Sequence, residues 1–393
     1  MRIAIVIILF LVIGGASFFA YQKYNNPNIL VVEKTNEIKV YTSNKTDFDL
    51  EIEAIQSISK QPKNVSDLKF YGWIPDWDMA DGLNTLQNNK FITSVSPFWF
   101  DLNDDGSLRT NLYTNWSELI EYTNNNGVDL VPTITAFNRD DLNKVLNSKD
   151  NVDRFINETI EYIQQNNYQG IDLDFESFYV NDQKPFFDML TQLKQRLTSS
   201  NKKLYFSALA KWGNNISYAQ TRSTLDYKRL GEIVDVFLIQ GYAYSPNNST
   251  TVGPIGPLNW LEDVVRYAIK EGVPREKIVL GINTYAQDWS DRPVQYDLLY
   301  YTAEGLPDND TATEAAVAYY HNGVDKLFSN YIVNESMIED WGEMLGSYDF
   351  NGQKRWIVYS NNESIELRKK LATDYGINGI SYWRLGDEGS LKL

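Results

Sequence analysis

Short apolar runs alternate with longer amphipathic stretches from about residue 69 to the C-terminus of the 393-residue chain. The short runs are rich in β-branched and aromatic residues and predict strands. The eight predicted strands cover residues 70–74, 92–98, 130–137, 170–175, 204–209, 234–242, 278–284 and 377–383. Hydrophobic positions at helical spacing predict helices between them, for example at 152–165, 184–197, 260–270 and 364–375. Strands separated by crossovers of helical length are typical of parallel βα units.

Closing eight such units gives an α/β fold of the (β/α)8 TIM barrel type, which is the architecture that the pattern predicts. An open doubly wound sheet is the alternative, but it normally has a glycine-rich phosphate-binding turn after its first strand. Here the first strand is followed by Pro75–Asp78, PDWD, without such a turn. About seventy residues between Tyr285 and Trp356 exceed a simple crossover. They predict a small α+β insertion at about 287–355, between strands 7 and 8 and beside the mouth where barrel enzymes carry out chemistry.

The N-terminal part of the chain departs from this pattern. Arg2 precedes an unbroken apolar run at 3–20, whose length lies between those of a signal-peptide core and a short membrane anchor. We therefore expect an extracellular or cell-envelope protein in which residues 1–20 are a signal peptide or a membrane anchor, the only contact with a membrane. Residues 21–66 are polar and mixed and predict a spacer, and residues 67–393 form the predicted barrel domain.

Composition excludes several classes of function. The 36 Lys and Arg against 52 Asp and Glu give a net charge of −16, so nucleic acid is not an expected partner. The chain has no cysteine and one histidine, His321, which excludes disulfides, thiolate nucleophiles and cysteine zinc sites. His321 lies outside any nucleophile-elbow motif, so a serine triad is not expected. Chemistry must then rest on carboxylates and tyrosines, and we expect a monomer that needs no cofactor or metal.

The segment Gly170–Phe178, GIDLDFESF, carries three acids at every second position. Alternate side chains of a strand share one face, so Asp172, Asp174 and Glu176 line up while the apolar residues between them point the other way. In a barrel the apolar set packs against the helices and the acids project toward the axis, with Glu176 last, at the carboxyl-terminal mouth. Closely spaced carboxylates cannot all ionise, so a shared proton keeps Glu176 available as a general acid near neutral pH.

Two other interpretations of the three acids remain open. A strand that faces solvent also alternates polar and apolar residues. Carboxylates can instead hold a cation, as in the Asp-x-Asp of metal-dependent glycosyl transfer, here through Asp172 and Asp174. The predicted fold opposes the first, because helices cover a parallel barrel and acids on its inner face are unfavourable unless they serve chemistry. The sequence offers no nucleotide-binding segment in favour of the second.

These residues resemble the signature of glycoside hydrolase family 18, Asp-Gly-x-Asp-x-Asp-x-Glu on the fourth barrel strand, which stands here as Gln169–Glu176, QGIDLDFE. Further segments resemble other parts of the family's barrel in the expected order, which argues against chance. They are YGWIPDWD (Tyr71–Asp78), VSPFWFDLNDDGSL (Val95–Leu108), VDVFLIQGYAY (Val234–Tyr244), the stretch Gly253–Trp289, WIVYSNNES (Trp356–Ser364) and GINGISYWRLGDE (Gly376–Glu388).

The resemblance implies hydrolysis of β-1,4 glycosidic bonds in an N-acetylglucosamine-containing glycan by a substrate-assisted retaining mechanism. The N-acetyl carbonyl of the bound sugar would attack its own anomeric carbon and form an oxazolinium ion. Glu176 would protonate the leaving oxygen and later activate water. Asp174 would hold the acetamido N–H, Asp172 would tune Asp174 from below, and Tyr242 would donate a hydrogen bond to the acetamido oxygen.

Aromatic residues complete the site that the resemblance implies. Trp383 would form the apolar floor under the reacting sugar, and Trp73, Trp99 and Tyr285 are further predicted substrate contacts. The alternative for Tyr242 and Trp383 is a role in the barrel core, since buried aromatic side chains fill barrels in any case.

Two positions depart from the family pattern. Gln169 replaces the first acid of the signature, at the far end of the strand, where we expect a changed supporting hydrogen bond more than changed catalysis. Where the sixth strand commonly reads Met-x-Tyr-Asp, this chain reads Gln240–Ala243, QGYA, without the acid that usually helps hold the acetamido group. A catalytically weak or inactive carbohydrate-binding protein is therefore the alternative function. Because Glu176 is present, we favour a hydrolase, with chitin-like polymers, peptidoglycan and N-glycan cores open as substrates.

Overall fold

The computed structural model describes residues 47–111, 116–214, 220–246, 249, 251–290, 300–301, 307–308 and 316–393. The predicted signal peptide or anchor at 1–20, and residues 21–46 of the predicted spacer, lie outside the described residues. In the part of the chain that is described, no helix combines the length and the apolar character needed to cross a membrane.

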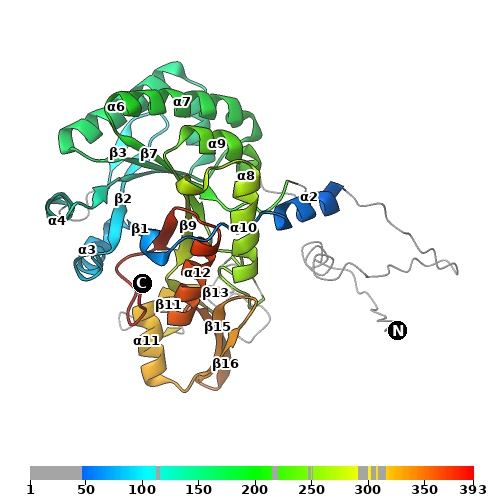
Figure 1. The fold of residues 1–393 in the computed structure, drawn as a ribbon. Helices are drawn as coiled ribbons and strands as arrows, with labels where there is room; N and C mark the ends of the chain where they lie inside the picture. The colour runs from blue at the N-terminus through cyan, green and yellow to red at the C-terminus, as the bar shows by residue number, and fades with distance from the viewer. Residues whose placement is uncertain are drawn as a thin grey trace, which may run out of the picture. The chain divides into compact units, whose positions relative to one another are not determined.

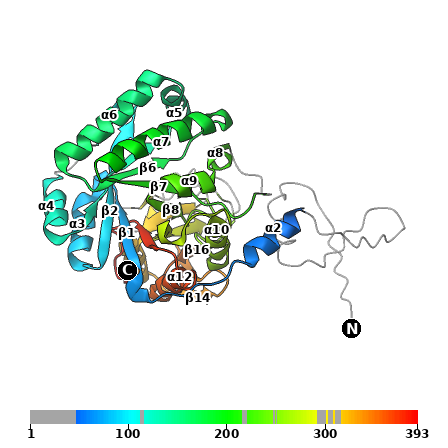
Figure 2. The same cartoon turned by 45° about the horizontal axis from the view of Figure 1, so that its top comes forward.

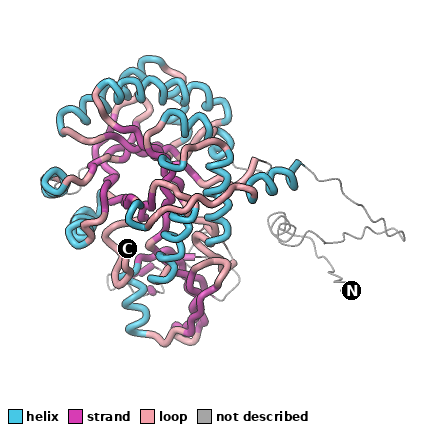
Figure 3. Tube along the Cα trace, in the orientation of Figure 1, coloured by secondary structure: helices cyan, strands magenta, loops and turns pink. Residues whose placement is uncertain are grey.

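Eight of the described strands run parallel and close into a barrel with helices around its outside (Figure 1, Figure 3). The order around the barrel is β1, β2, β5, β6, β7, β8, β9, β17 and back to β1. The strands are β1 (Lys69–Ile74), β2 (Ile92–Leu102), β5 (Thr133–Ala136), β6 (Gly170–Phe175), β7 (Lys203–Leu209), β8 (Val236–Gln240), β9 (Ile278–Asn283) and β17 (Gly379–Trp383). The TIM barrel that the hydrophobic pattern predicts is thus confirmed.

Helices lie between successive strands, and Figure 2 shows α5, α6 and α7 side by side along the outside of the barrel. α10 illustrates the pattern, since its buried residues Trp260, Leu261, Val264, Val265 and Ala268 recur three or four positions apart. The helices on the barrel are α3 (Met79–Asn88), α4 (Ser117–Asn126), α5 (Arg139–Leu146), α6 (Lys149–Asn166), α7 (Gln183–Ser199), α8 (Gln220–Thr224), α9 (Tyr227–Ile233), α10 (Leu258–Lys270) and α12 (Asn362–Asp374).

The buried side chains form an inner and an outer shell. Alternate residues of β8 show the division, because Val236 and Leu238 belong to the cluster inside the barrel whereas Phe237 and Ile239 belong to the larger cluster under the helices. The inner cluster consists of Tyr71, Trp73, Phe98, Val131, Tyr205, Val236, Leu238 and Val279, with Tyr242 and Trp383 packed against it. The barrel interior is therefore filled by side chains below its mouth.

The predicted third strand at 130–137 is divided in the structure. β4 (Asp129–Leu130) and β5 pair with β2 separately, and Val131 and Pro132 lie between them. Proline has no N–H to give to a strand ladder, which explains an interruption here. β3 (Leu108–Thr110) adds an antiparallel hairpin to β2 beyond the barrel.

The structure corrects part of the predicted spacer at 21–66. Residues Asp47–Gln56 form a helix, α2, that contacts α10. Ile55 on this helix is 1% exposed, and the Glu51 carboxylate accepts a hydrogen bond from the Asn214 N–H and pairs with Lys270. α2 is therefore a packed element of the barrel unit, because it buries both an apolar side chain and a paired carboxylate.

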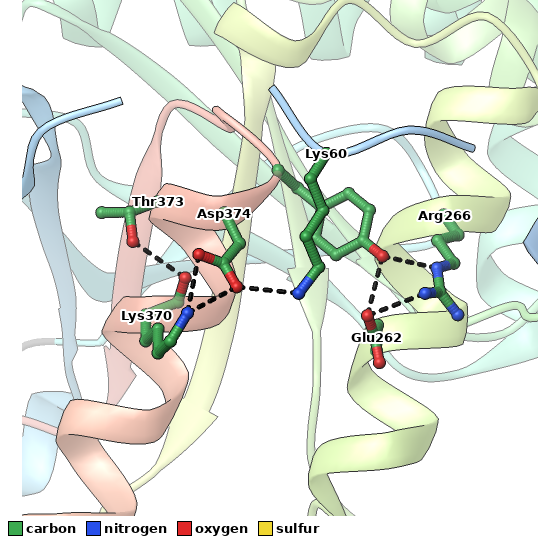
Figure 4. Close-up of polar contacts among 7 residues, drawn as sticks. Lys60, Glu262, Arg266, Lys370, Thr373 and Asp374 are labelled. Carbon is green, nitrogen blue, oxygen red and sulfur yellow. Dashed lines mark hydrogen bonds and ion pairs between the residues drawn. The ribbon is translucent and has the colours of Figure 1, made fainter. Parts of the chain in front are cut away.

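The segment after α2 is also bound to the barrel. Figure 4 shows Lys60 reaching the Asp374 carboxylate, at 2.8 Å, beside the pair formed by Glu262 and Arg266 on α10. The Lys63 N–H donates to the Thr373 carbonyl at 3.0 Å. Gly376 has a positive φ of 62°, and a Cβ there would lie 2.4 Å from the Gln61 carbonyl oxygen. Glycine at 376 therefore lets this segment approach the end of α12 closely.

The predicted insertion is an antiparallel sheet with one helix. Its five strands follow the order β13-β10-β16-β15-β14, and α11 packs on them through Val324 and Leu327. The elements are β10 (Tyr285–Ser290), β13 (Ala316–Tyr320), α11 (His321–Asn330), β14 (Asn334–Ile338), β15 (Glu343–Phe350) and β16 (Gln353–Tyr359), with a separate pair β11 (Tyr300–Tyr301) and β12 (Pro307–Asp308). The sheet begins and ends slightly outside the predicted range of 287–355, because the barrel chain enters it directly after β9.

Candidate active site

Strand β6 carries Asp172 and Asp174 in the orientation that its sequence predicts, and Glu176 follows directly after it. Ile171, Leu173 and Phe175 belong to the cluster under the helices, so Asp172 and Asp174 project into the barrel. Thr133 and Thr135 of β5 lie opposite Asp172 and Asp174 in register. The solvent-facing interpretation of this strand is wrong, since every residue of β6 is buried.

Asp172 is an acceptor held by three donors. Its carboxylate receives hydrogen bonds from the Trp73 indole N–H at 3.1 Å, the Thr133 hydroxyl at 3.1 Å and the Ser207 hydroxyl at 3.0 Å. The side chain is 0% exposed, and this burial raises the pKa of Asp172 to about 6 although all three hydrogen bonds lower it. Desolvation is therefore the strongest influence on the pKa of Asp172, and the three donors fix its carboxylate in place.

Asp174 and Glu176 form a close pair at the mouth. Asp174 is 4% exposed and Glu176, one residue past the end of β6, is half-buried. Burial, followed by the negative charges of Glu176 and Asp172 and a hydrogen bond to Glu176, raises the pKa of Asp174 well above its ordinary value. Two carboxyl groups this close repel each other when both are ionised, which favours an arrangement in which one proton is shared.

The side chain of Gln240, the last residue of β8, contacts both members of the pair. Its amide nitrogen donates to Asp174 Oδ1 at 2.9 Å and to Glu176 Oε1 at 2.8 Å. Sequence reasoning identified Gln240 only as a departure from the family pattern. A usable signal was present, because Gln240 continues the inward-facing series Val236 and Leu238 and is its one polar member.

Aromatic side chains lie beside the carboxylate pair. The Tyr242 ring is 6.4 Å from that of Trp383 with the planes at 25°, and 6.3 Å from that of Tyr285. Burial and the charges of Asp174 and Glu176 raise the pKa of Tyr242 well above its ordinary value. The phenol therefore keeps its proton and remains a hydrogen-bond donor.

Two of the predicted substrate contacts lie elsewhere. Trp73 is 1% exposed inside the barrel, where its indole N–H binds Asp172, so it supports a carboxylate below the mouth. Trp99 is 0% exposed in the cluster under the helices and stacks on Trp116 at 4.3 Å, which makes it a residue of the outer core. Phe98 takes the inner position instead, with its ring 5.0 Å from that of Trp383.

Two departures from the family signature have clear structural settings. Gln169 lies at the amino end of β6, where its side-chain oxygen accepts a hydrogen bond from the Leu130 N–H at 2.8 Å, far from the mouth along the strand. Ala243 is exposed and has a positive φ of 55°, an unusual conformation for a residue with a Cβ. Its methyl group offers no acceptor to a ligand.

The loop that carries Tyr242 and Ala243 is tied to the insertion by a buried ion pair. Glu343 of β15 and Arg368 of α12 are 3.2 Å apart and both 0% exposed. The Glu343 carboxylate accepts from the N–H groups of Ile255 and Gly256, and Arg368 donates to the Gly256 carbonyl. Because both charged groups of the ion pair also bond the backbone at Gly256, the loop end is fixed relative to the insertion.

Exposed aromatic side chains follow the carboxyl ends of four barrel strands. Trp77 after β1 is 61% exposed and Phe137 after β5 is 55% exposed. Tyr179 after β6 and Tyr244 after β8 are 38% and 37% exposed. Carboxyl ends of parallel strands share one side of a barrel, so these rings border the same mouth as Glu176.

The model of glycosyl hydrolases family 18 matches residues 17–388. The cortical fragment-lytic enzyme of Bacillus subtilis (strain 168) is 26% identical over 306 residues, which cover 76% of this chain and 65% of the length of that relative. The spore cortex-lytic enzyme SleL of Bacillus megaterium QM B1551 superposes with a TM-score of 0.69 at 22% identity, covering 83% of this chain and 72% of that one.

A chitinase from Chromobacterium violaceum ATCC 12472 also shares the fold, with a TM-score of 0.70 at 18% identity over 82% of this chain and 96% of that one. At these sequence identities the structural similarities establish the barrel fold alone. The reaction has to be inferred from the residues of the site. The family match covers nearly the whole chain and includes Asp172, Asp174 and Glu176. This chain therefore belongs to glycosyl hydrolases family 18.

Proposed function

We propose that the protein hydrolyses β-1,4 glycosidic bonds of an N-acetylglucosamine-containing glycan by a substrate-assisted retaining mechanism. The observation that carries this proposal is the carboxylate pair at the mouth. Glu176 is half-buried and hydrogen-bonded to the buried Asp174, and Asp172 lies below both. One proton shared by this pair, next to the buried carboxyl group of Asp172, suits a general acid.

Each side chain has a role that fits its position. Glu176 donates its proton to the leaving glycosidic oxygen while the acetamido carbonyl oxygen of the same sugar bonds to the anomeric carbon. Asp174 accepts the acetamido N–H as positive charge develops, and the Tyr242 phenol donates to the acetamido oxygen. Glu176, now a carboxylate, takes a proton from the water that attacks the anomeric carbon, and the carbon–oxygen bond to the acetamido group breaks.

The structure favours hydrolysis over binding alone, the alternative that Ala243 raises. A sugar-binding site has no need of buried acids whose pKa values are raised, because burial of a carboxylate is unfavourable unless it serves chemistry. The absence of an acid at 243 removes one acceptor near Tyr242, yet the pair that supplies the proton is complete. We infer that Ala243 alters how the acetamido group is held and leaves acid catalysis intact.

The exposed rings at the mouth support a polymeric substrate. Trp77, Phe137, Tyr179 and Tyr244 offer flat apolar surfaces on several sides of Glu176. Flat sugar faces pack on such rings. The names of the similar proteins include a spore cortex-lytic enzyme and a chitinase. We propose peptidoglycan or chitin-like strands as the substrate class and an extracellular or cell-envelope location, where such polymers are found.

The test compares the full-length chain with its Glu176→Gln variant on fluorogenic N-acetylglucosamine oligomers and on purified peptidoglycan. Glu176→Gln removes the proton donor, so kcat should fall about a thousand-fold. Glu161→Gln, an exposed acid on α6, serves as the matched control and should keep full activity. A parallel sample with EDTA should be unchanged. Binding to either glycan without turnover by the unaltered protein would overturn the proposal in favour of a binding protein, and loss of activity with EDTA would revive metal-dependent transfer.

A further inference from the structure

Gln240 occupies the carboxyl end of β8 with its side chain inside the barrel. Val236 and Leu238, two and four residues earlier, belong to the inner cluster, so the period of two places Gln240 on the same face. The side chain is 8% exposed, and the backbone of β8 is paired on both sides, by β7 and β9. Gln240 is thus a polar group on a rigid element, aimed at the mouth.

One nitrogen of Gln240 serves two carboxyl groups. It lies 2.9 Å from Asp174 Oδ1 and 2.8 Å from Glu176 Oε1. A primary amide has two N–H donors on its nitrogen, and each can go to one carboxyl group. The amide oxygen of Gln240 cannot take the place of its nitrogen. That oxygen only accepts hydrogen bonds, so it could face Asp174 and Glu176 only if each facing carboxyl oxygen carried a proton. The two facing oxygens are therefore held within about 6 Å of each other.

The charges around the pair make such a bridge necessary. Asp172 lies below it on β6, Tyr242 approaches from the loop after β8, and Tyr285 of β10 lies beyond Tyr242. Asp172 and the pair itself carry negative charge, which drives the carboxylates apart and favours their neutral forms. The hydrogen bond from Gln240 acts in the opposite direction on the pKa of Asp174. Gln240 thus offsets repulsion at the point where the two acids meet.

We propose that Gln240 is a positioning residue that holds Asp174 and Glu176 side by side in the arrangement in which they share one proton. Without it, Glu176 can turn toward the open mouth and Asp174 loses its amide donor. The family pattern commonly has a methionine at this position, and a methionine side chain cannot donate a hydrogen bond. Gln240 therefore gives the two carboxyl groups a donor that methionine does not provide. The proposal rests on the proposed function for its kinetic readout alone, because the bridge itself exists in the free protein.

The test is the pH profile of kcat/KM for the full-length Gln240→Met variant on a fluorogenic N-acetylglucosamine oligomer. Methionine keeps the length of the side chain and removes both donors, so ionised carboxylates lose stabilisation. Both limbs of the profile should move to higher pH by about one unit, and kcat at the optimum should fall about tenfold. Gln240→Glu, which keeps the shape and adds a fourth acid to the site, should move the acid limb further upward. Gln192→Met makes the same change at an exposed glutamine on α7, on the outside of the barrel, and should leave the profile unchanged.

A second measurement does not require turnover. Carboxyl-carbon NMR of protein labelled at Asp and Glu, with resonances assigned through Asp174→Asn and Glu176→Gln, reports the titration of the pair directly. Gln240→Met should raise the pH midpoint of this titration by the same amount as it shifts the two limbs of the pH profile of kcat/KM. If Gln240→Met lowers only the unfolding midpoint and moves neither the limbs nor the titration, the positioning role is overturned. If the unaltered protein cleaves no glycan but the NMR titration moves, the proposed function fails and the role of Gln240 stands.

Discussion

Two aspartates on one strand differ in what surrounds their carboxyl groups. Asp172 has three donors, from β1, β5 and β7, and cannot turn without breaking these hydrogen bonds. Asp174, two residues on, has one amide donor and a second carboxyl group as its partners. Asp172 is therefore a fixed negative charge near neutral pH, and Asp174 holds or shares a proton. Two like residues thus take different roles because of their neighbours.

The raised pKa values of Asp172 and Asp174 make the free energy of unfolding fall as pH rises. A carboxyl group whose pKa is higher in the folded state keeps its proton when the unfolded chain has released it. The favourable contribution of such a group to the free energy of unfolding is complete below its ordinary pKa of about 3.9. This contribution is lost as pH rises through the pKa of the group in the folded state. For Asp172, with a folded pKa of about 6, the loss is about 3 kcal/mol by pH 7. Asp174 adds a loss of the same sign, since its pKa is also raised.

Asp174→Asn should flatten this pH dependence while removing catalysis. The asparagine amide can donate to Glu176 and accept from Gln240, as a protonated Asp174 does, but it has no proton to lose. The unfolding free energy of the variant relative to the unaltered protein should therefore increase as pH rises above about 4, by up to about 1.4 kcal/mol per pH unit. Urea denaturation at several pH values measures it. Asp188→Asn, an exposed acid on α7, should show a constant difference, and parallel curves for Asp174→Asn would contradict the raised pKa.

How much of the site the sequence could predict depends on the strand. On β6, strict alternation of acids and apolar residues fixed which side chains face the barrel axis, and the structure agrees. On β2, Phe98, Trp99 and Phe100 are all aromatic, so alternation cannot distinguish the inner from the outer face. The register also shifts between Phe98 and Phe100, and both Trp99 and Phe100 lie in the outer core. Trp99 was therefore misplaced, and only the packed structure identifies Phe98 as the inner residue.

At the scale of elements, α2 was missed for an identifiable reason. Its fully inward positions, Glu51 and Ile55, are four apart, and one of them is an acid. Hydrophobic periodicity therefore shows no apolar stripe. The buried Glu51 is stabilised by contacts to Asn214 and Lys270, more than 160 residues away in the sequence, which no local pattern can reveal. The insertion, by contrast, was predicted from length alone, because no crossover needs that many residues.

Ile55→Ala tests whether α2 belongs to the barrel unit. Ile55 is 1% exposed, so removing its side chain should lower the free energy of unfolding of the full-length chain by about 2–4 kcal/mol. Leu50→Ala on the same helix is the matched control, because Leu50 is 52% exposed and should change the value by less than about 0.5 kcal/mol. Chemical denaturation followed by tryptophan fluorescence measures both. Equal, small effects would show that α2 is not packed on the barrel in solution.

For the whole molecule, the net charge of −16 sets a long-range preference among substrates. Anionic peptidoglycan strands are repelled during approach, whereas neutral N-acetylglucosamine oligomers are not. Raising the ionic strength from about 0.01 to 0.15 M shortens the screening length from about 30 to 8 Å. kcat/KM on soluble anionic strands should therefore rise several-fold, and kcat/KM on neutral oligomers should change less than about twofold. The same salt response for both substrates would show that net charge does not control association.

The central claim is that the carboxylate pair supplies a proton and the substrate supplies the nucleophile. Inverting glycosidases need about 6.5–9.5 Å between their carboxyl groups to admit a water molecule. Asp174 and Glu176 share the Gln240 nitrogen, which keeps their facing oxygens closer than that. The most direct measurement is proton NMR of the first-formed product from an N-acetylglucosamine oligomer, recorded before the anomers equilibrate. The β anomer should appear first, with retained configuration, whereas an initial α anomer would rule out a retaining mechanism with the substrate as nucleophile.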